Sequence, residues 1–399
     1  MVVWQAYRFA LDPNDRQRGR LASHAGGGRY AYNLGLQWLK KSLEVNPKGL
    51  NGVVPGAFEM HQRWNRWKTD PTNGVSWWSD NAESVYQQAF TDLDRAIKTF
   101  LASRSGKRRG PRIGFPRFKH KGKSRDRFQV SGPIQVGPGW VQLPGLGRLR
   151  LSEDPAKLRR RLDAQTARIT SASVSRDAQR WHVSFRVECK RQSPPPRAKD
   201  DVVGMDLGIT SLVTLSNGAV FAPVRALGSN LKRLRRLSKA HSRKKRHSAN
   251  RRRSAARLAR CHARIVHLRR DYLHKVTTHL AQNHGRIVME ALNVPAMIRD
   301  RQLTRSIADA SWGTLSSMLE YKCRWYGAEL IRADRFFPSS KICSVCGFRK
   351  QSLALGERTF SCENCGSVLG RDLNAAINLA HWPVSPAVRR RLEMPVEGT

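Results

Sequence analysis

The sequence VVGMDLGIT at positions 202–210 is a largely apolar run that contains a single charged residue, Asp206. A short apolar run of this kind is typical of a buried β-strand. A carboxylate near the end of such a strand is costly to bury unless a cation compensates its charge. The segment therefore predicts the first strand of a sheet, with a functional acid at its end.

The segments that follow predict a definite order of strands and helices. SLVTLSNG at 211–218 is strand-like and ends in an Asn-Gly hairpin signal, and a third strand is expected at 219–224. The next expected elements are a helix at 231–262, a strand at 286–290, a helix at 311–326, a strand at 329–333 and a helix at 373–380. This is the element order of an RNase H-like α/β fold.

Two further acids occupy matching places in this order. Glu290 ends the fourth strand and Asp372 opens the last helix. In an RNase H-like sheet the first and fourth strands are neighbours and the last helix packs across them, so Asp206, Glu290 and Asp372 are expected to converge. Carboxylates suit Mg²⁺ or Mn²⁺, and two such ions about 4 Å apart support phosphodiester hydrolysis. Taken singly, each acid could instead belong to a turn, a sheet edge or a helix N-terminus.

Four of the seven cysteines form two Cys-x-x-Cys pairs separated by fifteen residues: Cys343, Cys346, Cys362 and Cys365. Each pair turns two thiolates toward one point, and two pairs complete a tetrahedral Zn²⁺ site. The alternatives are a redox pair or chance clustering. Because four thiolates leave no open position, we expect this zinc to be structural.

The charge of the chain points to a polyanionic partner. The 399 residues include 73 Lys and Arg against 30 Asp and Glu, a formal net charge of +43. Such an excess strains a fold by self-repulsion unless a polyanion neutralises it. No long apolar run or signal-peptide pattern supports a membrane, so nucleic acid is favoured. The odd number of cysteines, without a secretory signal, argues against a disulfide framework and suggests a reducing cytoplasm.

Two basic segments are candidate nucleic-acid contacts. Residues 231–262 contain no acid and place Lys and Arg on nearly every face of a helix, unless the tract is disordered. Residues 114–123 interleave basic residues with aromatics that could stack on bases or belong to the core. The tryptophans at 64, 67, 77 and 78 are expected to be packing anchors. The candidate basic contacts are Arg117, Lys119, Lys121, Lys123, Arg243, Lys244, Lys245, Arg246, Arg251, Arg252 and Arg253.

The N-terminal half predicts a different architecture. A strand at 2–10 precedes helices at 15–41 and 81–101, with Pro/Gly/Asn-rich loops at 46–56 and 70–74. Short alternating strands in 132–151 and 167–188 suggest a small β-barrel or sheet. The Pro-rich stretch SPPPRAK at 193–199 predicts the boundary between two domains.

Several motifs together resemble the TnpB proteins of bacterial and archaeal insertion sequences, which are RNA-guided DNA nucleases ancestral to the type V CRISPR effectors. The similarity covers nearly the whole chain. The motifs are GMDLGIT at 204–210, VMEALNV at 288–294, CSVCG and CENCG at 343–347 and 362–366, GRDLNAAINLA at 370–380, RYAYN at 29–33, AESVYQQAFTDLDRAIKTF at 82–100 and GFPRFK at 114–119.

The resemblance implies a β-barrel wedge domain at 1–12 and 112–198 with a helical recognition insertion at 13–111. It also implies a RuvC-type nuclease domain at 199–340 and 369–385, a zinc ribbon at 341–368 and a tail at 386–399. The implied partners are a guide RNA and double-stranded target DNA, with a short target-adjacent motif read near Gln87. Asp206, Glu290 and Asp372 would be the catalytic acids, whose RuvC site cuts both strands in turn.

The sequence departs from the family at Ala291 and Gly370, where members often have Asp. Neither position is one of the three metal ligands, so we expect activity to survive. Two alternatives stay open: an RNA-guided DNA-binding protein with weak or no cleavage, and a transposase or resolvase that acts without RNA. The oligomeric state and the target-adjacent motif do not follow from the sequence.

Overall fold

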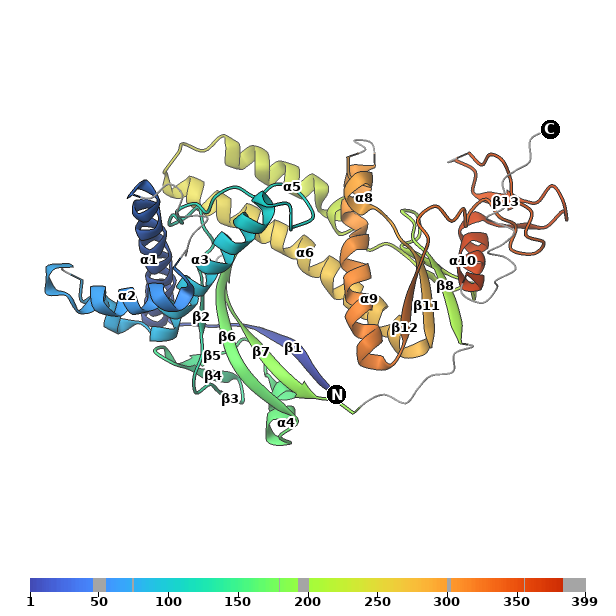
Figure 1. The fold of residues 1–399 in the computed structure, drawn as a ribbon. Coiled ribbons are helices and arrows are strands. Elements are labelled where there is room, and N and C mark those ends of the chain that lie inside the picture. Colours follow the sequence, from blue (N-terminus) through green and yellow to red (C-terminus); the bar gives the residue numbers. More distant parts are fainter. Residues whose placement is uncertain are drawn as a thin grey trace. The chain divides into compact units, whose positions relative to one another are not determined.

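The computed structural model describes residues 1–45, 55–73, 75–178, 180–192, 201–299, 303–354 and 356–382. The chain divides into two compact units, Met1–Arg191 and Gln192–Thr399 (Figure 1). The linker expected at 193–199, the tail expected at 386–399 and most of the loop expected at 46–56 lie outside the described residues. In the part that is described, no helix is long and apolar enough to cross a membrane.

Three helices of the first unit enclose an aromatic core. They are α1 (Asp15–Val45), α2 (Ala57–Thr69) and α3 (Glu83–Arg104), with 3₁₀ turns at Pro71–Asn73 and Trp77–Asp80. Trp64 is fully buried, and its ring centroid lies 5.3 Å from that of Trp67 and 4.7 Å from that of Tyr86. Trp77 and Trp78 pack against the same core, so the four tryptophans are packing anchors, as predicted.

The strands of the first unit pair as two antiparallel sheets. The larger has the order β1-β7-β6-β2 and the smaller β3-β4-β5. Alternate residues of β7, from Trp181 to Cys189, are buried, which is the pattern of a strand with one face on a core. The elements are β1 (Val2–Ala10), β2 (Arg127–Val130), β3 (Gln135–Gly137), β4 (Trp140–Leu143), β5 (Gly147–Arg150), α4 (Ala156–Asp163), β6 (Ala167–Asp177) and β7 (Arg180–Lys190).

The second unit contains the sheet that the sequence predicts. Its order is β10-β9-β8-β11-β12, in which β8 runs antiparallel to β9 and parallel to β11. The first and fourth predicted strands are therefore neighbours. The strands are β8 (Val202–Asp206), β9 (Val213–Leu215), β10 (Val220–Phe221), β11 (Arg286–Glu290) and β12 (Glu329–Ala333). The third strand is shorter than expected, because only two of the residues at 219–224 pair with β9.

Helices cover both faces of this sheet, which lies between α9 and α10 in Figure 1. One core, formed with α6 and α9, contains Val203, Met205, Ile287 and Met289. The other contains Val288 and Leu379 of α10, with Val202 packed against it. Because side chains alternate along a strand, Asp206 and Glu290 belong to the face that α10 covers. The helices are α6 (Ala249–Asn283), α7 (Val294–Met297), α8 (Thr304–Ala310), α9 (Trp312–Tyr326) and α10 (Arg371–His381).

Gly204 allows α10 to approach β8 closely. A Cβ atom at this position would overlap the backbone carbonyl of Ala376 and the backbone nitrogen of Ala380. Only a residue without a side chain lets the backbone of a helix touch the backbone of a strand in this way. Gly204, the first glycine of the GMDLGIT motif, therefore sets the distance between Asp206 and the helix that carries Asp372.

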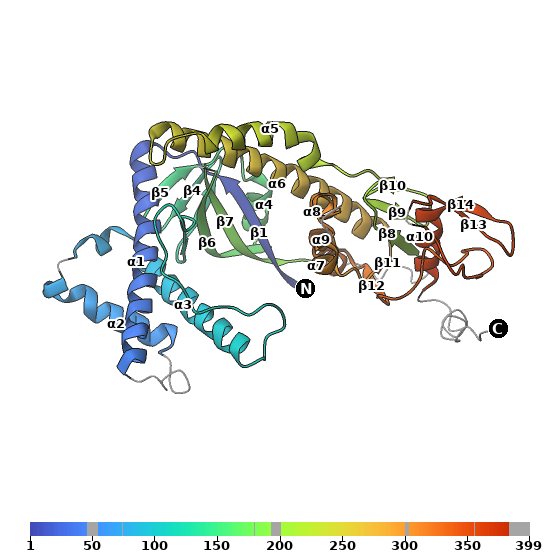
Figure 2. The same cartoon turned by 90° about the horizontal axis from the view of Figure 1, so that it is seen from above.

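The prediction of a single basic helix at 231–262 is wrong in one respect, because two helices form in this segment. They are α5 (Ala226–Ser242) and α6, which lie side by side in Figure 2. His247 has a left-handed φ of 64°, and the Ser248 hydroxyl caps α6 by accepting from the backbone N–H of Arg251 at 3.1 Å. A small apolar core around Cys261 and Ile265 joins the pair, so the tract is a packed helical hairpin and not a disordered one.

Candidate functional site

Parallel pairing of β8 with β11 brings Asp206 and Glu290 together. Met289 pairs with Met205, so the two acids that follow lie next to each other at the carboxyl ends of neighbouring strands. The Ser339 hydroxyl donates to Oε1 of Glu290 at 2.6 Å. Both acids are half-buried.

Asp372 reaches the same place from the first turn of α10. A Cβ on Gly208, two residues beyond β8, would lie 3.9 Å from Oδ2 of Asp372. Burial, together with the negative charges of Glu290 and Asp372, raises the pKa of Asp206 to about 8, against a smaller lowering by Arg371. Glu290 and Asp372 are thus near enough to affect the ionisation of Asp206.

No salt bridge relieves this concentration of negative charge. Among the residues that the structure describes, none of the three acids has a Lys, Arg or His nitrogen within 4.0 Å, although the chain has 73 Lys and Arg. In the described ranges, the one group of three or more His, Cys, Asp or Glu side chains close enough together to hold a metal ion is formed by the four cysteines and not by the three acids. Carboxylate oxygens are hard donors of the kind that Mg²⁺ and Mn²⁺ prefer.

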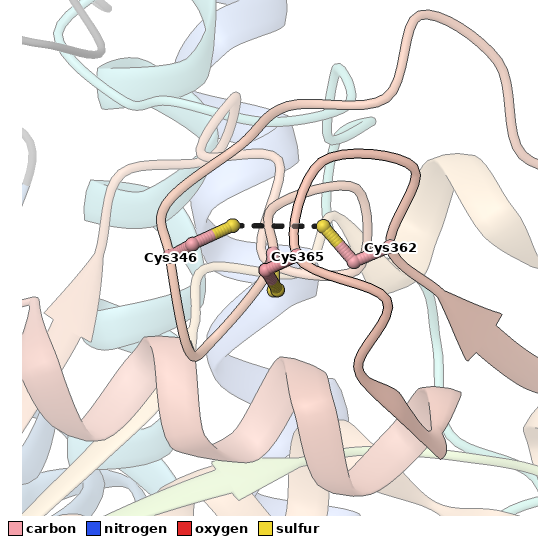
Figure 3. A group of neighbouring side chains, drawn as sticks. Cys346, Cys362 and Cys365 are labelled. Carbon is pink, nitrogen blue, oxygen red and sulfur yellow. Dashed lines mark hydrogen bonds between the residues drawn. The ribbon is translucent and has the colours of Figure 1, made fainter.

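The four predicted cysteines form one cluster. Their Sγ atoms all lie within 4.8 Å of one another, with 3.7 Å between Cys343 and Cys365 and 3.5 Å between Cys346 and Cys362. Figure 3 shows Cys346 and Cys362 facing each other, with Cys365 between them. Tetrahedral zinc with bonds of about 2.3 Å places its sulfurs about 3.8 Å apart, so the cluster fits a zinc site.

Both cysteine pairs use the same turn. The backbone N–H of Gly347 donates to the carbonyl of Cys343 at 2.9 Å, and Gly366 repeats this bond to Cys362 at 3.1 Å. The two glycines have φ values of 77° and 70°, which side chains rarely allow. Burial raises the pKa of Cys362 to about 11. The pKa of Cys343 falls to about 6, because hydrogen bonds from Ser367 and the backbone outweigh burial.

Most of the predicted nucleic-acid contacts are on the surface. The exposed ones are Gln87, Arg117, Lys121, Lys123, Arg243, Lys244, Lys245, Arg246, Arg252 and Arg253. Of the aromatics beside them, Phe115 packs against the helical core of the first unit, whereas Phe118 is 38% exposed. Figure 2 shows α5 and α6, which flank the basic loop at residues 243–248.

Lys119 and Arg251 are used within the fold. Nζ of Lys119 lies 3.6 Å from the ring centroid of Tyr32, and burial lowers the pKa of this lysine. The backbone N–H and carbonyl of Lys119 each bond the side-chain amide of Asn33 at 2.8 Å. Arg251 donates to the carbonyl of Lys244 at 2.8 Å and so closes the loop between α5 and α6. These two residues therefore have structural partners that the sequence does not reveal.

Sequence reasoning also missed three polar residues beside the acids: Ser339, Asn374 and Asn378. All three are buried. The two asparagines are four residues apart on α10 and bond the loop that leads into the first cysteine pair. A detectable signal exists in GRDLNAAINLA, because two asparagines on one face of a short apolar helix have no local advantage there.

Three family models match parts of the chain. The OrfB_IS605 family, described as "Probable transposase", matches residues 184–301. The Cas12f1-like TNB domain matches residues 312–379 and therefore includes the cysteine cluster. A helix-turn-helix domain of the OrfB_IS605 type matches residues 1–47.

Curated relatives extend over nearly all of the chain. A Mycobacterium tuberculosis protein with the provisional name RNA-guided DNA endonuclease is 34% identical over 404 residues, covering 96% of this chain and 87% of that protein. Escherichia coli InsQ, with the same provisional name, is 30% identical, with 94% and 91% covered. A solved Cas12f1–sgRNA–target DNA complex covers 95% of this chain and 99% of its own protein chain. Its TM-score of 0.57 at 13% identity shows a likeness of fold, a multidomain α/β architecture.

Proposed function

The chain belongs to the TnpB family, and we propose that it is an RNA-guided DNA endonuclease. In this proposal Asp206, Glu290 and Asp372 bind Mg²⁺ or Mn²⁺ and form the RuvC-type catalytic site. The observation that carries the proposal is the proximity of three carboxylates, two at the ends of β8 and β11 and one in the first turn of α10, that have no salt bridge in the described part of the chain, within a chain of net charge +43. A cluster of carboxylates with a perturbed pKa is a candidate cation site, and so are acids left without a salt bridge in a strongly basic protein.

Each acid has a distinct part in the proposed reaction. Divalent cations bound by the three acids would supply an activated water and charge stabilisation for the leaving oxygen. Asp206 must lose its proton to bind a cation, because burial holds its metal-free pKa near 8. Glu290 is oriented by the Ser339 hydroxyl, and Asp372 is carried by a helix that packs directly on β8.

We further propose that the four cysteines hold a structural Zn²⁺ and that the remaining surfaces hold nucleic acid. The wedge at 1–12 and 112–198, as a β-barrel, and the recognition insertion at 13–111 would hold the guide RNA and the DNA duplex. The exposed Gln87 would approach the target-adjacent bases. The exposed lysines and arginines at 117–123 and 243–253 would contact phosphates. The relatives named above are bacterial, and we place the protein in the cytoplasm.

The test begins with the RNA. The protein is co-expressed with its natural 3′-flanking DNA, and the RNA that copurifies is sequenced. The complex is then incubated with Mg²⁺ and a plasmid that carries the guide-matched target behind a randomised flank. Asp206→Asn is the test variant. Asp271→Asn is its matched control, because Asp271 is an exposed acid of the same unit, and its ion-pair partner among the described residues is Lys275 on its own helix.

We expect linearisation that depends on the guide, disappears in Asp206→Asn and persists in Asp271→Asn. Retention of the target without cleavage by the unaltered protein would replace the nuclease with a DNA-binding function. Absence of both RNA and guide dependence would leave a DNA-processing enzyme that works without RNA.

A further inference from the structure

Two buried asparagines of α10 hold the loop that leads into the first cysteine pair. Oδ1 of Asn374 accepts from the backbone N–H of Ser344 at 2.9 Å, and its Nδ2 donates to the carbonyl of Ile342 at 2.7 Å. Nδ2 of Asn378 donates to the carbonyls of Ile342 and Ser339 at 2.7 and 2.8 Å. The loop is thus fixed to α10 at both of its ends.

The same loop ends at a catalytic acid on its other side. Ser339, whose carbonyl is held by Asn378, donates its hydroxyl to Oε1 of Glu290 at 2.6 Å. Ser344, held by Asn374, stands between the two cysteines of the first pair. A continuous path of hydrogen bonds therefore runs from the cysteine pair through α10 to Glu290.

Burial makes this path costly to interrupt. Asn374 is 0% exposed, Ser339 2% and Asn378 7%, so water does not compete for their partners. A buried donor or acceptor that loses its partner keeps the full penalty of desolvation. Asparagine is also less favourable than alanine or leucine inside a helix, so the local structure gives no reason for either residue. Their contribution is the tertiary contact.

We propose that Ser339, Asn374 and Asn378 are positioning residues that couple metal binding at the cysteine cluster to the geometry of Glu290. This inference rests on the proposed function, because it takes Glu290 as a ligand of the catalytic cation and the cysteines as zinc ligands. When the cysteine pair is ordered, the loop and α10 hold the Ser339 hydroxyl against Glu290. When it is not, the loop has lost one of its two attachments and Glu290 loses its fixed orientation.

The test for the Ser339 step measures Mn²⁺ binding to the full-length, RNA-free protein by electron paramagnetic resonance. Asp206→Asn protein supplies the background from other sites. We expect Ser339→Ala to weaken Mn²⁺ binding roughly 10–100-fold with an unchanged zinc content. Ser339→Thr keeps the hydroxyl and should bind Mn²⁺ as the unaltered protein does. Ser317→Ala is the matched control, because Ser317 is exposed and bonds only the carbonyl of Gly313 in its own helix.

The test for the asparagine step is a double-mutant cycle. Cys365→Ser, at the exposed cysteine, should weaken Mn²⁺ binding in the otherwise unaltered protein. It should add nothing when Asn374 and Asn378 are both alanine, because the path is already interrupted. Hydrogen exchange of residues 338–344 gives a second measurement that does not depend on activity. The exchange rate of these residues should rise in Cys365→Ser and in the variant with alanine at both Asn374 and Asn378.

Unchanged Mn²⁺ binding in Ser339→Ala, or fully additive effects in the cycle, would overturn the coupling. If the unaltered protein still showed guide-directed cleavage alongside either of these results, the proposed function would hold and only the coupling would be contradicted. The reverse result, no guided cleavage but weaker Mn²⁺ binding in Ser339→Ala, would support the coupling and contradict the proposed function.

Discussion

Replacing Gly204 with alanine tests how the catalytic acids are brought together. The new Cβ would overlap the carbonyl oxygen of Ala376 and the nitrogen of Ala380, and it would lie 3.0 Å from the carbonyl carbon of Ala376. All of these are backbone atoms of α10, so no side chain can rotate away, and the helix must move off β8. Overpacking costs about 1–3 kcal/mol, and a clash with backbone belongs at the upper end, near 3 kcal/mol.

The effect should appear in stability and in activity. A loss of about 3 kcal/mol corresponds to a fall of roughly 6–12 °C in the melting temperature of a unit of this size, measured by calorimetry on the full-length protein. Because the shift also displaces Asp372 from Asp206, cleavage should fall about 100-fold. Both changes are expected from Gly204→Ala in the same protein preparation.

Gly313→Ala is the matched control for this substitution. Gly313 lies in α9, and no heavy atom lies within 4 Å of the position of its added Cβ. Alanine there should stabilise the helix by up to about 1 kcal/mol. If Gly204→Ala melts and cleaves like Gly313→Ala, the proposed contact between α10 and β8 does not set the geometry of the acids.

Three other predictions follow from the same structure. The pKa of Asp206 without metal is about 8, so a cation must displace a proton from it below that pH. The apparent Mg²⁺ affinity should therefore rise about tenfold per pH unit between pH 6 and 8 and then level off. The Mg²⁺ concentration that gives half-maximal cleavage, measured at each pH, tests this. Cys346→Ser should lower the zinc content measured on the purified protein, whereas Cys261→Ser, at a buried cysteine outside the cluster, should not. Burial lowers the pKa of Lys322 to about 8, so the unfolded state binds the extra proton above that pH. The unfolding free energy of the unaltered protein, relative to Lys322→Met, should therefore rise from pH 8 to 10 in denaturant titrations.

The nuclease sheet follows closely from the sequence because its strands are short apolar runs with clear ends. The strands predicted at 286–290 and 329–333 coincide with β11 and β12. The break in the basic segment does not follow, because the lysines and arginines at 243–246 are good helix formers. It depends on the left-handed His247, the cap at Ser248 and the packing of α5 on Cys261. The first two are local but weak signals, and the third exists only in the folded chain.

The site residues that could be predicted are those whose residue type is unusual for their place in the sequence. An acid at the end of an apolar strand stands out, as do paired cysteines at fixed spacing. Ser339 does not, because its partner Glu290 lies 49 residues earlier in the chain and the intervening sequence gives no hint of the contact. Lys119 is the opposite case, a residue predicted for the site that has a structural partner. A basic residue beside aromatics resembles a nucleic-acid contact, but Lys119 lies over the ring of Tyr32 within the fold.

The position of Arg371 shows how a basic chain keeps its acids unpaired. This residue is next to Asp372 in sequence, and its charge lowers the pKa of Asp206, so it is the base best placed to neutralise the site. Its guanidinium instead donates to the carbonyls of Ala354 and Glu357 at 3.0 and 3.3 Å. A guanidinium held by backbone carbonyls cannot turn toward a carboxylate without leaving those carbonyls unsatisfied. The loop before the second cysteine pair thus keeps the nearest base away and leaves the three acids available to a cation.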